Sequence, residues 1–93
     1  MADEGNEQRL GISVPRYDPT LGVRIDEPDF GGLSFRVVGA GVHIKGDWHG
    51  LRYLARWCLA LSDESAPSGC RVHLDPGAEL DDISPRVVIE RDG

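Results

Sequence analysis

Two cysteines and three histidines are the side chains of this sequence best suited to catalysis or metal binding. Nucleophilic catalysis requires a serine or cysteine beside a histidine and an orienting group. Cys58 falls on the apolar arc of a predicted helix and Cys70 on the inward face of a predicted strand, where cysteines are ordinarily inert core residues. The sequence contains no G-x-S-x-G segment and no glycine-rich phosphate loop. We therefore expect no catalytic residues and no enzymatic activity.

A weak metal site could be built from His43, His73 and Asp75, which fall on the outward side of predicted strands. The two histidines are 30 residues apart, and neither occurs in a paired spacing such as C-x-x-C or H-x-x-x-H. We expect no metal and no cofactor. A small-ligand or metal-binding domain that uses these three residues is kept as an alternative.

The outward side of the predicted strands collects basic side chains. They are Arg24, Arg36, His43, Lys45, Arg71, His73 and Arg86, with Asp26 and Glu90 among them. Such a face is either a solvated ladder of ion pairs or a partner-binding surface. It carries no aromatic residues on which bases could stack, and the chain has a net charge of −6. We therefore expect neither nucleic acid nor a membrane as partner.

A helix over residues 47–62 is the element with the strongest periodic pattern. Asp47 is a good N-cap, because its carboxylate can accept hydrogen bonds from the amides of the first turn. The apolar arc of this helix contains Leu51, Leu54, Ala55, Cys58 and Leu61. Tyr53 falls outside that arc and Trp57 at its edge, which favours a role for both as interface anchors on the helix shoulder.

Alternating apolar and polar residues predict strands over 21–26, 33–38, 42–45, 70–75 and 86–91. The Gly39–Gly41 segment is either the turn of a hairpin or a kink inside one long strand. The expected fold is α+β, in ββ(β)αββ order: an antiparallel sheet of four to five strands with one helix packed across one face. Residues 1–20 are predicted to form a flexible tail, unless they add an edge strand, and residues 21–93 a single domain.

The composition is that of a small globular domain, with 93 residues, 40% hydrophobic and 28% charged. A core of this size is marginal, so a homodimer or a tight partner would supplement its stability. Nine of the ten basic residues are arginine, which is typical of a GC-rich bacterial genome. No apolar run is long enough to span a membrane and no signal peptide is evident, so we expect a cytoplasmic protein with reduced cysteines.

The run GDWHGLRYLARWCLAL, followed by GCRVHLDPGAEL and ISPRVVIER, resembles small bacterial immunity proteins of polymorphic toxin systems. The resemblance covers roughly residues 42–91. The matching residues are Gly46, Asp47, Gly50, Leu51, Leu54, Ala55, His73, Leu74, Asp75, Pro76, Leu80, Ser84 and Pro85. This resemblance implies a cytoplasmic protein that binds and neutralises a cognate toxin without catalysis.

The residues and the resemblance together predict a non-catalytic protein-binding module, similar to an immunity protein, whose partner is a protein such as a toxin domain. It would dock through its outward sheet face and its helix shoulder. The expected partner-binding residues are Arg36, Tyr53, Trp57, Arg71, His73 and Asp75. A homodimeric structural protein is the second alternative.

Overall fold

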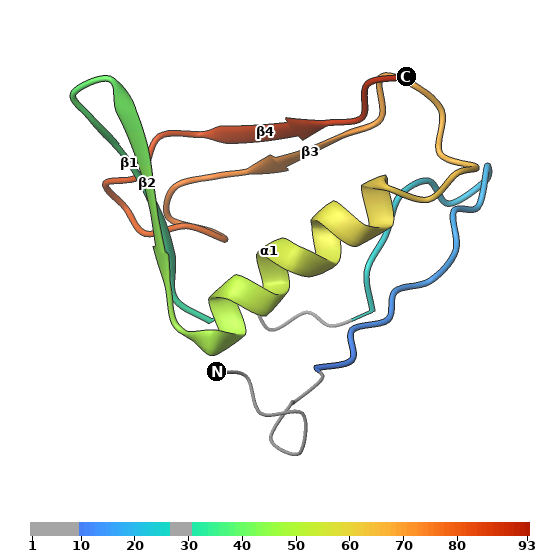
Figure 1. Ribbon diagram of the computed structural model, residues 1–93, viewed down its shortest axis with the longest axis horizontal. Helices are drawn as coiled ribbons and strands as arrows, with labels where there is room; N and C mark the ends of the chain where they lie inside the picture. Colours follow the sequence, from blue (N-terminus) through green and yellow to red (C-terminus); the bar gives the residue numbers. More distant parts are fainter. Residues whose placement is uncertain (1–9, 27–30) are drawn as a thin grey trace, which may run out of the picture.

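The structure is a computed structural model that describes residues 10–26 and 31–93. Its elements are β1 (Leu33–Val38), β2 (Gly41–Gly46), α1 (Trp48–Leu61), β3 (Arg71–Leu74) and β4 (Val87–Glu90). β1 pairs with β2 and β3 with β4, both antiparallel, so the described strands form two separate two-stranded sheets. The two hairpins run crosswise, and α1 lies diagonally against them (Figure 1). The α+β class is confirmed, whereas the single sheet of four to five strands is wrong.

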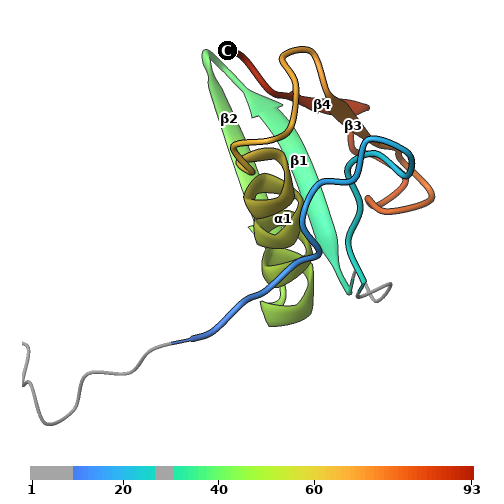
Figure 2. The ribbon, with the colours of Figure 1, turned by 90° about the vertical axis from the view of Figure 1, so that its right-hand side faces the viewer.

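The sheet is divided because a loop, rather than a strand, lies along the outer edge of β1. Asp81 N donates to the carbonyl of Leu33 at 3.0 Å. Phe35 N donates to Ser84 Oγ at 3.0 Å. The next residue, Pro85, has no N–H group and so cannot donate a ladder hydrogen bond to a neighbouring strand. Figure 2 shows the resulting arrangement, in which β1 lies between β2 and the second hairpin.

The connection between β1 and β2 is a hairpin turn, which decides between the two alternatives for the Gly39–Gly41 segment. Val38 pairs with Gly41, so Gly39 and Ala40 are the two residues of the turn. Gly39 has φ +59°, in the left-handed region that favours glycine.

The strand predicted over 21–26 is wrong. The Asp18 carboxylate accepts from Thr20 N at 2.7 Å and from Leu21 N at 3.3 Å, and Asp18 O accepts from Gly22 N at 2.7 Å. These local bonds form a turn that uses the backbone donors a strand would need. Val23 and Ile25 still pack against the core, as their alternation predicted.

Helix α1 begins as expected, with Asp47 as its N-cap. The carboxylate accepts from Gly50 N at 2.7 Å and from Gly32 N at 3.1 Å, which ties the helix start to the residues before β1. Both bonds lower the pKa of Asp47, the bond from Gly50 more than that from Gly32. A Cβ at position 50 would overlap the Gly32 carbonyl oxygen. Only glycine therefore allows this close approach, and the contact fixes the rotation of the helix.

The buried side of α1 differs from the predicted apolar arc. Gly50, Tyr53, Ala60 and Leu61 are buried, whereas Cys58 is exposed. The expectations that Cys58 is buried and Tyr53 exposed are therefore wrong. The predicted arc was centred on the apolar side chains of the helix. The close contact of Gly50 with the backbone of Gly32 turns a different side of α1 toward the core.

The core lies between α1 and the two hairpins. Its buried members are Leu33, Phe35, Tyr53, Leu61, Val72, Leu74 and Leu80. Leu74 is the only large side chain of the described residues with 0% exposure. Cys70 packs against this cluster as a half-buried residue. Over the described residues, no helix is long and apolar enough to cross a membrane.

Candidate partner-binding surface

The outer face of the β3–β4 hairpin carries three of the predicted site residues close together. Arg71 and His73 are exposed on β3 and lie opposite Glu90 and Val88 of β4. Arg71 Nη2 lies 3.6 Å from Glu90 Oε1. Ion pairs in solvent hold their partners weakly, so both side chains can rearrange toward a partner.

Asp75 directly follows β3 and forms the end of this face. Its Oδ1 accepts from Arg86 Nε at 2.6 Å. Asp75 N in turn donates to Glu79 at 2.9 Å, and Asp75 O accepts from Leu80 N at 3.1 Å. The carboxylate is thus oriented by a turn and paired with a cation, at a position that is still partly exposed.

Arg36 lies apart from these residues, on the outer face of the β1–β2 hairpin. Its Nη2 donates to Asp81 Oδ2 at 3.3 Å. Ser84 Oγ also donates to Asp81, at 2.6 Å, and this bond contributes more than Arg36 to lowering the pKa of Asp81. Arg36 and Lys45 line an open hollow of about 520 Å³ whose acidic lining residues are Asp47 and Asp81. The hollow is therefore mixed in charge and favours no single ligand class.

Tyr53 and Trp57 belong to the packing between α1 and the hairpins. Tyr53 is 6% exposed, and burial raises its pKa. Its ring meets that of Trp57 edge to face, with 6.3 Å between centroids. Tyr53 and Trp57, for which partner contacts were predicted, therefore pack in or against the core.

Exposed apolar side chains that the sequence did not predict occur on the β1–β2 hairpin and on α1. They are Val37, Val42, Ile44, Trp48, Leu51 and Leu59. Alternation alone assigned the strand valines to one face, and the hairpin register confirms that Val37 lies opposite Val42. The alternation of apolar and polar residues could not show that the turn end of this hairpin extends beyond the core. Val37 and Val42 are 71% and 68% exposed, respectively.

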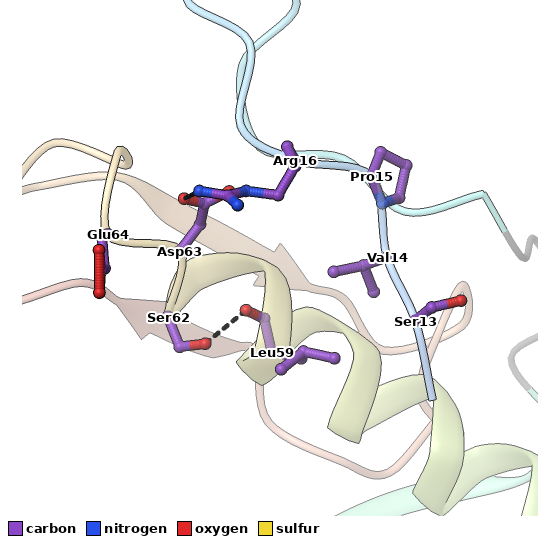
Figure 3. A pocket seen from close by; sticks show the side chains of 8 residues that line it. All are labelled: Ser13, Val14, Pro15, Arg16, Leu59, Ser62, Asp63 and Glu64. Atoms are coloured by element: carbon purple, nitrogen blue, oxygen red, sulfur yellow. Dashed lines mark hydrogen bonds and ion pairs between the residues drawn. The ribbon is translucent and has the colours of Figure 1, made fainter. Parts of the chain in front are cut away.

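A second hollow, of about 450 Å³, lies where residues 13–16 pass the end of α1 (Figure 3). Val14 and Leu59 are among its lining residues. Arg16 and Asp63 also line it, and Arg16 donates to Asp63 through Nε at 2.9 Å and through Nη2 at 3.1 Å. Asp63 also accepts from Tyr17 N at 2.7 Å, and these bonds, with the Arg16 pair first, hold its pKa well below its usual range. The Asp63 carboxylate thus anchors residues 16 and 17 beside the end of α1, so the ion pair in this hollow has a structural role.

The alternative metal site is not assembled. His43 is on β2 and His73 on β3, in separate sheets, and Asp75 is bound to Arg86. In the part of the chain that the structure describes, no group of three or more His, Cys, Asp or Glu residues is arranged to hold a metal ion.

Several residues that carry the sequence resemblance have structural roles. Asp47 and Gly50 fix the start of α1, Leu74 and Leu80 are core residues, and Ser84 attaches its loop to β1. His73 is different, because it is exposed and none of these contacts involves it.

Comparisons with known proteins identify one family. The family model described as Immunity protein 32 (Imm32) matches residues 41–92, from the start of β2 through β4. Searches among curated proteins and among solved structures found no significant match. The matched residues make up more than half of the 93-residue chain and agree with the resemblance over roughly 42–91. The chain belongs to the Immunity protein 32 family.

Proposed function

We propose that this protein binds a bacterial protein toxin and neutralises it without catalysis, by covering part of the toxin's surface. Membership of the Immunity protein 32 family is the observation that carries the proposal. A toxin-neutralising role requires an exposed surface of suitable chemistry rather than a reactive group. The outer face of the β3–β4 hairpin, within the matched residues, is such a surface.

The chemistry of this face suits a protein partner. Val88 is exposed at its centre, opposite His73, and the charged residues Arg71 and Glu90 lie beside this pair. An apolar centre with a polar surround is the usual anatomy of a protein interface. Arg71 and His73 can donate hydrogen bonds, while Glu90 and Asp75 can accept them. The face therefore offers both signs of charge to a partner of complementary pattern.

The net charge of −6 adds a long-range preference for a basic partner. It would accelerate encounter with such a toxin, and salt would weaken that effect. Arg36 stays a predicted contact at the margin, because it lies on the other hairpin.

The test is calorimetric titration with isolated candidate toxin domains encoded in the same genome. We expect the wild type to bind and the Arg71→Glu, His73→Glu double variant to bind at least about tenfold more weakly, since reversed charges would oppose the partner. Co-expression should show the same difference as a loss of growth protection.

His43→Glu is the matched control, because it makes the same histidine change on the other hairpin. It should bind like the wild type. Equal binding by the double variant would overturn the choice of this face, and absence of wild-type binding would overturn the neutralising function.

A further inference from the structure

Strand β2 has an unpaired edge. Residues 41–45 are all exposed, and β1 is the only described strand that pairs with β2. In Figure 2, β2 forms the outer side of its hairpin, away from β3 and β4. The edge therefore presents backbone donors and acceptors to solvent.

The backbone groups directed outward are those of residues 42, 44 and 46. Asp47 N donates to Gly32 O at 3.1 Å, just beyond the Leu33–Gly46 pair. Hydrogen-bonded and non-hydrogen-bonded pairs alternate in an antiparallel ladder. The pairs that contain Val42, Ile44 and Gly46 are therefore the non-hydrogen-bonded ones, whose N–H and C=O groups point away from β1.

The other side of the hairpin agrees with this assignment. Leu33 O and Phe35 N, from the same non-hydrogen-bonded pairs, are bound there by Asp81 N and Ser84 Oγ. The equivalent groups of β2 have no such cover among the described residues. One edge of this hairpin is thus occupied and the other is open.

The open edge lacks the usual protection against pairing. Such protection comes from proline, several charges, a bulge or a very short strand. β2 is a regular six-residue strand, GVHIKG, whose one formal charge is on Lys45. Beside the edge lie the exposed apolar residues Val42 and Ile44, and Leu51 of α1 extends them: its Cγ is 3.3 Å from where a Cβ on Gly46 would be.

We propose that β2 pairs antiparallel with β2 of a second copy, about a two-fold axis at His43. The product is a four-stranded sheet in the order β1-β2-β2-β1. Each Val42 then lies opposite Ile44 of the other copy, so the apolar residues cover one another. Lys45 lies opposite Gly41, so no basic side chains face each other except the two histidines at the axis.

The direction of the backbone groups and the side-chain pairs together select this register. Pairing requires residues 42, 44 and 46 to oppose one another, because they carry the outward groups. An axis at Ile44 would place Lys45 opposite His43, and an axis at Lys45 would place the two lysines opposite each other. An axis at Val42 would move Ile44 beyond β2, opposite Ala40. The axis at His43 retains both Val–Ile pairs, and β2 is thus complementary to itself, as a two-fold interface requires.

The test is the oligomeric state of the full chain, by sedimentation velocity over increasing concentration. The wild type should reach twice its monomer mass of 10.2 kDa. H43K and H43E should each weaken self-association by about tenfold or more, because like charges would meet at the axis. An equimolar mixture of the two should restore the dimer, because the introduced lysine would then face the introduced glutamate.

H73K and H73E are the matched controls, since His73 is an exposed histidine in the middle of the other hairpin. They should self-associate like the wild type, singly and mixed. Arg36 lies opposite His43 across β1 and β2, so a substitution at His43 also changes the contacts within the hairpin. Thermal unfolding of every variant measures that effect on stability separately. A wild type that stays monomeric, or a mixture that does not restore the dimer, would overturn the proposal. Toxin binding is proposed for the other hairpin, so either proposal can fail without the other.

Discussion

The two hairpins have similar sequence patterns but different relations to the core. In β3–β4, inward residues such as Val72 and Leu74 are buried along the whole length of β3. In β1–β2, Leu33 and Phe35 are buried near the base, whereas Val37 and Val42 near the turn are exposed. The comparison shows that alternation assigns a residue to a face, while burial depends on what lies opposite that face. The inner face of β3 is therefore buried throughout, whereas the turn end of the β1–β2 hairpin keeps exposed apolar residues.

The largest expected effect compares one inward residue from each hairpin. Leu74→Ala should lower the free energy of unfolding by about 3 kcal/mol, because it leaves a cavity at a fully buried position. Val42→Ala should change it by less than about 0.5 kcal/mol, because Val42 is already exposed. Urea unfolding followed by circular dichroism, at a concentration where the chain is monomeric, measures both. Similar losses in the two variants would mean that the hairpins are equally buried.

A smaller effect is expected from releasing the attached edge of the β1–β2 hairpin. Ser84→Ala should cost about 2 kcal/mol, because the amide of Phe35 loses its acceptor in a buried setting. Amide exchange at Phe35 should accelerate in the same variant. Ser34→Ala is the control, since Ser34 Oγ makes only a long 3.5 Å contact with Lys45 O. If the two serine variants were equally stable, the attachment at Ser84 would not hold the hairpin.

The smallest expected effect concerns how folding stability depends on pH in acid. The pKa of Asp81 in the folded chain lies below its ordinary value of 3.8, so the unfolded chain takes up a proton first as pH falls. This stabilisation is complete above pH 3.8 and is lost as pH falls through the folded value. The urea midpoint of Asp81→Asn should therefore fall less steeply with pH in this window than that of the wild type. Equal slopes for the variant and the wild type would contradict a contribution from Asp81.

Local signals were sufficient to predict most elements of the fold. Asp47 identified the helix start, and alternation identified the four strands of the described residues within one or two residues. The rotation of α1 and the division of the sheet could not be predicted this way. They depend on contacts between distant segments, namely Gly50 with Gly32 and Ser84 with Phe35.

The same distinction applies to the candidate surface. Strand alternation correctly predicted that Arg71 and His73 face outward, because period-two geometry requires no knowledge of neighbours. The exposure of Tyr53 was predicted wrongly because the prediction counted only apolar side chains, and glycine has none. Gly50 nevertheless determines which side of α1 is buried. The apolar surface on β2 was missed because its exposure depends on how far the core extends.

The family match begins at Gly41, immediately after the turn of the first hairpin, so β1 lies outside it. Yet β1 supplies Leu33 and Phe35 to the core. The residues that the family model matches therefore do not complete the core by themselves, because β1 covers one side of it.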